Sequence, residues 1–145
     1  METLYSTALR WTTDLSVGCD QLNDRNRALL DALATTENMI ASASNAALAA
    51  WMQARLDQFA QLLDAEEVEL AAADYPELAF HRLLHDEGRR IAEHARTQLQ
   101  HCASDVALMK LVRTSCTSLA LWFVRHVLDA DPFFSPYVDS RYRTA

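Results

Sequence analysis

Hydrophobic side chains recur at helical spacing along four stretches of the chain, residues 20–41, 46–73, 77–102 and 106–130. Within each stretch the apolar positions return every three or four residues, so they share one face of an α-helix. Helices of about 20–28 residues are ~30–42 Å long and, when joined by short connections, pack antiparallel. The pattern therefore predicts an all-α fold, an up-down-up-down four-helix bundle.

The connections between the four stretches contain residues that start or stop helices. The segment Ser42-Ala43-Ser44-Asn45 supplies side-chain oxygens that can cap the second helix, and Ser104-Asp105 can cap the fourth. Pro76 suits the first turn of the third helix, whereas Pro132 prevents the fourth from continuing. Each predicted boundary therefore has a local chemical cause.

An N-terminal arm, residues 1–19, and a tail, residues 131–145, flank the predicted helices. Trp11, Leu15 and Val17 give the arm apolar side chains that can pack on the helices. A chain of 145 residues suits one domain, and only two glycines and three prolines interrupt it. We expect a single domain over residues 1–145.

Charge and cysteine content narrow the class of protein. The net charge is -7 and Lys110 is the only lysine, so a phosphate-binding surface for nucleic acid is not expected. Three cysteines without a Cys-x-x-Cys pair indicate reduced thiols. No uninterrupted apolar run reaches ~18 residues, and we expect a cytoplasmic protein that does not bind a membrane. No protein partner is indicated.

Five residues with metal-binding side chains fall on the inward faces or ends of the predicted helices. His81 and His85 are one helical turn apart, so both can reach one ion. Glu66 precedes the turn at Pro76 by ten residues and would lie beside them in an antiparallel pair. His126 and Asp131 lie where the fourth helix ends, beside the start of the third. These five residues are the predicted metal ligands.

Each ligand alone has a simpler explanation. A His pair four residues apart can arise by coincidence, and a lone Glu66 commonly belongs to a surface ion pair. His126 could be a core histidine, and Asp131 could be a helix cap. The convergence of all five at one level favours a metal site. Three imidazoles and two carboxylates suit iron, or another first-row transition metal, with one coordination position open, and are too rich in nitrogen for calcium or magnesium.

Residues 11–137 also carry a series of short motifs in a characteristic order. They are Trp11, Leu15-Ser16-Val17-Gly18-Cys19-Asp20, Leu62-Leu63-Asp64-Ala65-Glu66-Glu67, Tyr75-Pro76, His81-x-x-x-His85, and Trp122-Phe123-Val124-Arg125-His126 followed by Asp131. Taken together they resemble the hemerythrin family, bacteriohemerythrins included. The resemblance implies a four-helix bundle with two irons in its core and reversible dioxygen binding.

The resemblance assigns roles to the candidate ligands. His81, His85 and His126 would hold one iron, while Glu66 and Asp131 would bridge it to the second iron. Two further histidines of the family hold that second iron.

The sequence departs from the family at those two histidines. They correspond to Asn26 and Leu62, and both belong to the same iron. His94 and His101 lie two or more turns beyond His85, so they cannot replace them. We therefore expect one ion per chain, and a small pocket beside Leu62 and Asn26 where a substrate could enter.

A single ion argues against ordinary oxygen carriage, because the family's dioxygen binding draws an electron from each of two irons. The favoured function is a mononuclear non-heme iron protein acting as a dioxygen-dependent or redox metalloenzyme, with dioxygen or an organic molecule as partner. Two alternatives remain: a protein that binds or senses dioxygen or nitric oxide without catalysis, and a degenerate interaction module. Glu69 could reach a second ion or carry a proton, or could be a solvated carboxylate, and Glu67 is expected in a salt bridge or beside a ligand. No catalytic residue is assigned.

Overall fold

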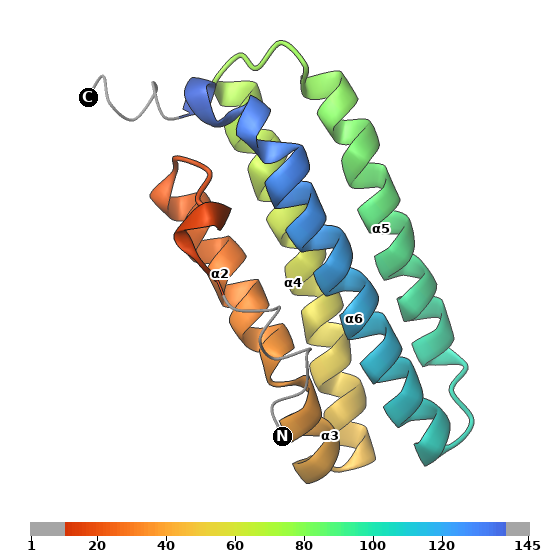
Figure 1. Ribbon diagram of the computed structural model, residues 1–145. Coiled ribbons are helices and arrows are strands. Elements are labelled where there is room, and N and C mark those ends of the chain that lie inside the picture. The colour runs from red at the N-terminus through yellow and green to blue at the C-terminus, as the bar shows by residue number, and fades with distance from the viewer. Residues whose placement is uncertain (1–10, 139–145) are drawn as a thin grey trace.

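The computed structural model describes residues 11–138, and every regular element in this range is helical (Figure 1). Two short 3-10 helices, η1 and η2, lie near its ends, and five α-helices lie between them. The elements are η1 Thr13–Leu15, α2 Asp20–Ala34, α3 Thr36–Ser42, α4 Asn45–Ala72, α5 Leu78–Gln100, α6 Asp105–Asp129 and η2 Asp131–Phe133. The all-α prediction is confirmed, while the first ten and last seven residues of the predicted arm and tail lie outside the described residues.

The first predicted helix, residues 20–41, is wrong as a single element. The structure divides it into α2 and α3 at Thr35, whose φ of -86° and ψ of 1° depart from helical values. The hydroxyl of Thr35 donates to the carbonyl of Ala32 at 2.7 Å, and that of Thr36 donates to the carbonyl of Leu33 at 2.6 Å. Threonine hydroxyls that bond preceding carbonyls bend helices. Two adjacent threonines therefore explain the break, although the apolar pattern continues across it.

Serine caps begin two of the long helices. Ser44 accepts a hydrogen bond from the amide of Ala47 at 3.2 Å, and Ser104 accepts one from the amide of Ala107 at 3.1 Å. Each oxygen satisfies an amide that the first helical turn leaves without a partner. Between α4 and α5 the chain reverses through Asp74, whose φ of 52° lies in the left-handed region. This reversal sets the register of α4 against α5.

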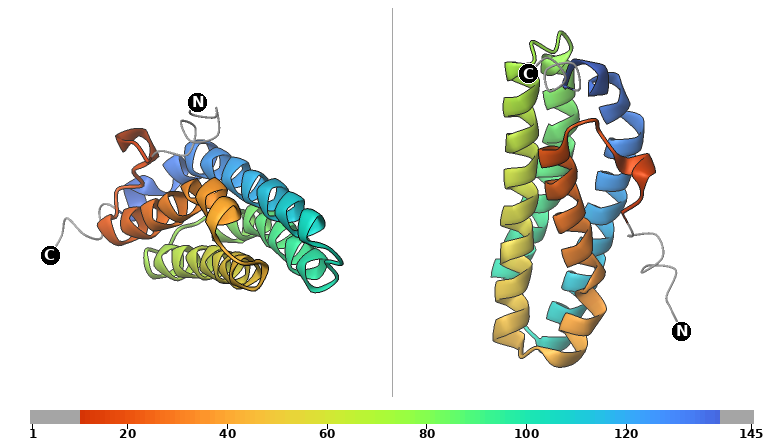
Figure 2. Two further views of the ribbon diagram at one scale, coloured as in Figure 1. Left: turned by 90° about the horizontal axis from the view of Figure 1, so that it is seen from below. Right: turned by 90° about the vertical axis from the view of Figure 1, so that its left-hand side faces the viewer.

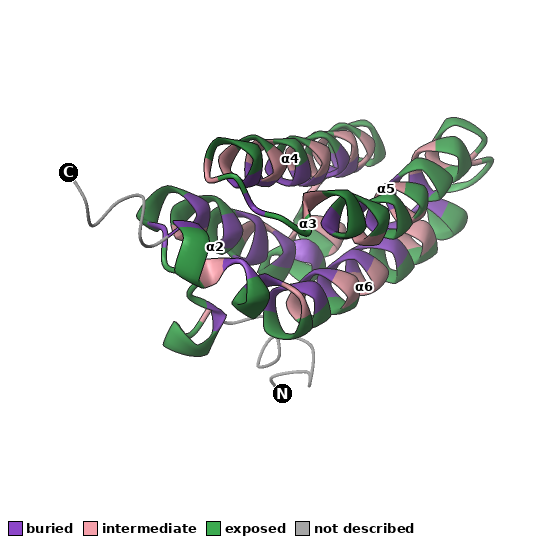
Figure 3. Cartoon of the chain, turned by 90° about the horizontal axis from the view of Figure 1, so that it is seen from above, coloured by how far each residue is buried: buried purple, intermediate pink, exposed green. Residues whose placement is uncertain are grey.

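The long helices lie side by side and alternate in direction along the chain (Figures 1 and 2). α5 packs against both α4 and α6, while α2 and α3 cover the remaining side through contacts with α4 and α6. Buried residues occupy the faces that the helices turn toward one another (Figure 3). The largest fully buried side chains are Phe59, Phe123, Phe134, Leu29, Leu30, Leu33, Leu48, Met52, Leu56, Leu63, Leu70 and Leu119.

The arm and the tail add apolar side chains to this interior. Leu15 and Val17 are buried, and Trp11 is partly buried against the core. Phe134 and Val138, beyond η2, are also buried. The described part of the arm thus packs through the residues that the sequence indicates.

One segment, Asp105–Phe133, is long enough and apolar enough to cross a membrane by length and composition, with a mean hydropathy of 1.2. One such helix is weak evidence for a membrane span, because a core helix of a water-soluble protein passes the same test. The inward face of α6 contributes Val112, Leu119 and Phe123 to the core, which accounts for part of its apolar composition.

Candidate metal centre

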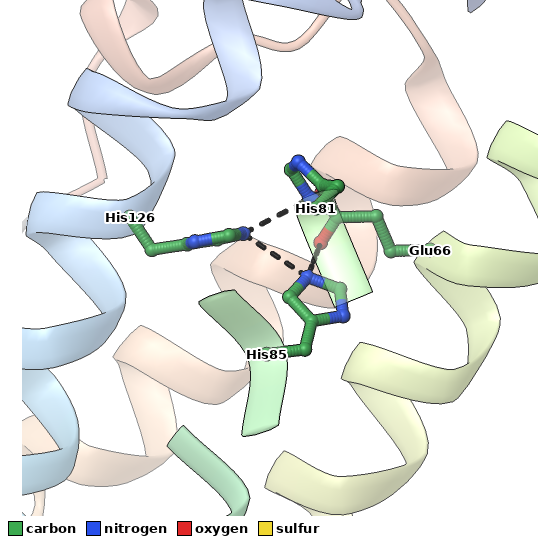
Figure 4. A group of neighbouring side chains, drawn as sticks. All are labelled: Glu66, His81, His85 and His126. Atoms are coloured by element: carbon green, nitrogen blue, oxygen red, sulfur yellow. Dashed lines mark hydrogen bonds and ion pairs between the residues drawn. The ribbon is translucent and has the colours of Figure 1, made fainter. Parts of the chain in front are cut away.

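Four of the five predicted ligands meet inside the helical assembly (Figure 4). Glu66 comes from the last third of α4, His81 and His85 from the first turns of α5, and His126 from the last turn of α6. All four are buried, and one donor atom from each lies within 4.8 Å of the others. The arrangement follows from the helices: α4 and α5 run antiparallel from the reversal at Asp74, and α6 ends where α5 begins.

The donor atoms are spaced as ligands of one ion are spaced. His81 Nε2 lies 3.1 Å from Glu66 Oε1, His85 Nε2 lies 3.1 Å from His126 Nε2, and His85 Nε2 lies 3.5 Å from Glu66 Oε2. Two ligands held ~2.1 Å from a metal at right angles are ~3.0 Å apart. Three imidazole nitrogens and a carboxylate therefore surround a common point at distances that suit a transition ion.

Asp131, the fifth predicted ligand, adjoins this group from η2. Its Oδ1 lies 3.0 Å from His126 Nε2 and 3.5 Å from His81 Nε2. The residue is only 1% exposed, yet neither carboxylate oxygen makes a hydrogen bond of good geometry. A buried carboxylate without such partners is costly unless a cation balances it. The donor set and this unsatisfied carboxylate together fit a bound metal ion.

Mutual interactions shift the pKa values of these side chains. Burial opposes the ionisation of Glu66, but the imidazoles of His126, His81 and His85 outweigh it and hold its pKa well below the usual range. Burial together with the charge of Glu66 raises the pKa of Asp131. Burial disfavours the charged form of His126, but Asp131 and Glu66 overcome it and raise its pKa to about 9. Burial lowers the pKa of His81.

A chain of ion pairs supports His85 from outside the group. The Nδ1–H of His85 donates to Glu67 Oε1 at 2.9 Å, so that Nε2 faces the other donor atoms. Arg89 lies 2.9 Å from the same carboxylate oxygen and 2.8 Å from Asp64. Burial opposes the ionisation of Glu67, but Arg89 and His85 outweigh it and lower its pKa. Glu67 therefore stays ionised and fixes the ring orientation.

Sequence reasoning placed Glu67 beside a ligand but missed Arg89. The signal was present in the spacing, because Arg89 follows His85 by one helical turn and so extends the same side of α5 toward α4. Its partners on α4, Glu67 and Asp64, are three residues apart and therefore also neighbours on one face. Charge pairing between the two helices could have been inferred from these positions.

Trp122 lies beside the candidate ligands from α6. Its ring is stacked on that of His126, with centroids 4.7 Å apart and planes 10° apart. Gly88 provides the space on α5, because a Cβ at that position would lie 2.8 Å from the Trp122 ring. A glycine inside a helix costs about 1 kcal/mol relative to alanine. The close approach of the indole accounts for this residue.

The remaining predicted positions lie elsewhere. Asn26 and Leu62 are buried, each 4% exposed, and neither belongs to the donor group. Glu69 is half-buried and does not belong to it either, while His94 and His101 are exposed. A hollow of about 760 Å³ reaches the group between α5 and α6, and neither Asn26 nor Leu62 lines it. The pocket expected beside those two residues stays a prediction.

Comparisons with known proteins give a fold and no family. No protein-family model matches the sequence, and no curated protein matches it either. A crystal structure described only as that of a leucine-to-phenylalanine mutant superposes with a TM-score of 0.69 at 17% identity, covering 89% of this chain and 95% of the other. This likeness shows that the arrangement of helices occurs in a protein solved by experiment.

Proposed function

We propose that this protein is a hemerythrin-like, up-down-up-down four-helix bundle that binds one transition-metal ion, iron, and acts in dioxygen-dependent or redox chemistry. The observation that supports it is the convergence of three imidazole Nε2 atoms with Glu66, at separations that match neighbouring ligands of a single ion. Asp131 completes the set as the fifth ligand. The motif order in the sequence supports the same site.

A single ion follows from the residues that face the interior from α2 and α4. A second ion in the hemerythrin arrangement would need ligands at positions 26 and 62, which are Asn26 and Leu62. Leucine has no donor atom, and an amide oxygen is a weak ligand beside imidazole. The two carboxylates then bind one ion and have no second ion to bridge.

The protein's own side chains define what the site can do. Iron, when bound, would supply one-electron chemistry and an open coordination position for a small molecule. Glu67 fixes His85 so that its Nε2 faces the group, and the stacked Trp122 restricts rotation of the His126 ring. Burial of the four donor side chains lowers the local dielectric constant, which strengthens electrostatic interactions at the site. These features are those of a preorganised metal site.

Metal analysis of protein produced with iron tests the proposal. We expect about one ion per chain, and loss of that ion in His85→Ala. His94→Ala is the matched control, because it removes an exposed histidine from the same helix. Circular dichroism checks that both variants keep their helices, and Glu67→Gln should weaken binding by ~10–100-fold without removing a ligand.

The oxidised protein provides a second readout. A single ferric ion gives an electron paramagnetic resonance signal, whereas two coupled ferric ions are silent. Two ions per chain or a silent spectrum would contradict the single-ion site. Absence of metal after anaerobic reconstitution would contradict the whole proposal and leave an interaction module. Consumption of dioxygen by the iron-loaded protein, lost in His85→Ala, would support redox chemistry over simple gas binding.

A further inference from the structure

A hollow of about 760 Å³ lies between α5 and α6, directly beside the donor group. Its walls are mainly apolar and come from α5, α6, η2 and the connection before α5. The apolar lining comprises Phe80, Leu84, Ile91, Leu121, Trp122 and Phe133. Pockets of 300–1,000 Å³ with apolar walls commonly hold small organic molecules. The size and lining of this hollow fall in that class.

Three large hydrophobic side chains around the hollow are exposed. Phe80 is 59% exposed, Leu121 is 65% exposed and Phe133 is 72% exposed. A single exposed apolar residue on a protein surface is ordinary. Here three elements, α5, α6 and η2, each place one around the same opening. Exposed apolar groups that gather at one concave place indicate a binding site.

The inner end of the hollow meets the candidate metal centre. His81 and His126 both line it, and so does Trp122, which is stacked on His126. Because two of the three imidazoles border the hollow, a molecule held there lies next to the position an ion would occupy. The pocket and the centre therefore form one continuous site.

The charges around the hollow select against anions. Three carboxylates line it, those of Glu77, Glu87 and Asp129. Two cations line it as well: Arg125, which lies 3.7 Å from Asp129 in an ion pair, and His126, whose charge the buried carboxylate of Glu66 balances from 3.9 Å. An anionic ligand would meet an excess of negative charge, and like charges in contact reduce affinity. An uncharged ligand avoids this cost.

We propose that the hollow between α5 and α6 binds an uncharged, mainly apolar small molecule with an aromatic ring or alkyl chain, as the organic substrate or ligand of the adjacent centre. The inference deepens the proposed function, and it rests on that function only in calling the molecule a substrate of the metal centre. Binding itself depends on the walls, and it can be measured without metal.

Two fluorescent probes with the same ring system test the charge selection. N-phenylnaphthylamine is uncharged, whereas anilinonaphthalene sulfonate is an anion of nearly the same shape. Titrated into the metal-free full chain, the uncharged probe should bind at one site per chain and about 5-fold or more tighter than the anion. Equal binding, or tighter binding of the anion, would overturn the proposed class of ligand.

A matched pair of leucines on α6 locates the probe. Leu121→Gln changes a residue that lines the hollow, while Leu128→Gln changes an exposed leucine of the same helix that does not. Leu121 is 65% exposed and Leu128 is 47% exposed, so the fold should tolerate both changes. We expect Leu121→Gln to weaken the uncharged probe by about 10-fold, equivalent to ~1.4 kcal/mol, and Leu128→Gln to leave it unchanged. Equal effects of the two variants would overturn the location.

Sedimentation of the same samples distinguishes a ligand pocket from a protein interface. A concentration-dependent dimer of the wild-type chain that Leu121→Gln makes monomeric would assign the hollow to a second copy and overturn the proposal.

Cobalt(II) in place of iron tests whether the bound probe lies near the metal, because the visible spectrum of cobalt should shift when the uncharged probe is added. An unchanged spectrum with bound probe would separate the pocket from the centre. Probe binding without metal uptake would contradict the proposed function alone, whereas metal uptake without probe binding would contradict this inference alone.

Discussion

The interior of the protein has two sides that are equally buried and differ in chemistry. The side formed by α5 and α6, the imidazole side, presents His81, His85 and His126. The side formed by α2 and α4, the apolar side, presents Leu62 one turn before Glu66, together with Asn26. The packing at Leu62 shows that this fold can fill its interior with hydrocarbon. Three buried imidazoles are therefore not a requirement of packing, and they indicate a binding role.

Adding histidines to the apolar side, so that both sides carry imidazoles, should have the largest effect on the metal content. We predict that Asn26→His combined with Leu62→His raises the iron content from one ion per chain to two, because the added imidazoles supply the ligands that a second ion lacks. Metal analysis and the oxo-bridge absorption of the oxidised protein measure the change. Leu62→His alone is the control and should stay at one ion. A double variant that still binds one ion would show that the two sides differ in backbone geometry as well as in side chains.

Shortening a buried side chain of the apolar side should strongly reduce the free energy of unfolding. Leu29 of α2 is 0% exposed, so Leu29→Ala should lower the free energy of unfolding by about 2–5 kcal/mol through lost burial and a cavity. Urea denaturation of the metal-free protein measures it. Val68→Ala, at a position 66% exposed on α4, should stay within about 0.5 kcal/mol of the wild type. A small effect of Leu29→Ala would show that this side repacks.

The Cys116 thiol shows the effect of burial where it outweighs the supporting groups, here the hydroxyl of Thr36 and the charge of Arg55. Burial raises the pKa of Cys116 to about 11, and its Sγ lies 3.6 Å from Met52 Sδ. A rise of two units from 9 lowers the thiolate fraction near pH 8 by about 100-fold. Alkylation followed by mass spectrometry should therefore modify the partly buried Cys102 far faster than Cys116 in the native state. Equal alkylation rates of the two cysteines would show that solvent reaches the buried face of α6.

An exposed ion pair between α3 and α6 should have the smallest effect. Arg113 donates to both oxygens of Glu37, at 2.7 and 3.0 Å. The hydrogen bond from Arg113 lowers the pKa of Glu37, so its stabilisation is present above the unfolded-state pKa near 4.5 and is lost as the pH falls below it. Both groups are about half exposed, which limits the contribution to less than about 1 kcal/mol. Glu37→Gln should remove this small pH dependence, with Asp31→Asn, at an exposed carboxylate of α2, as the control.

The sequence predicts the helices and most of the donor group because both depend on local spacing. His81 and His85 share a face by the helical repeat, and Glu66 follows from the antiparallel turn. The break at Thr35 escapes prediction because the apolar repeat continues through it, while the cause lies in two hydroxyls that bond carbonyls of the preceding turn. Residue type at single positions, rather than the pattern, decides that feature.

Features that join distant segments were harder to predict. The hollow between α5 and α6 depends on the spacing of the two helices, to which the close approach of Trp122 to Gly88 contributes. Arg89 can form its ion pairs with Glu67 and Asp64 only when α4 and α5 are aligned to within one helical turn. The apolar repeat of each helix identifies its inward face but leaves its distance from neighbouring helices open. The hollow beside Trp122 was not predicted, and the pocket expected beside Leu62 and Asn26 stays a prediction.

Three of the ligand positions, Glu66, His81 and His85, belong to the single hairpin of α4 and α5, whereas His126 arrives from α6 across 41 residues. An ion bound by all four would connect these segments as a cross-link does. Closing a loop of that length in the unfolded chain removes conformational entropy worth about 4 kcal/mol in the loop-entropy treatment of disulfides. Loading with metal would therefore raise the thermal midpoint and hold α6 against the hairpin. Removal of the ion would lower that midpoint again.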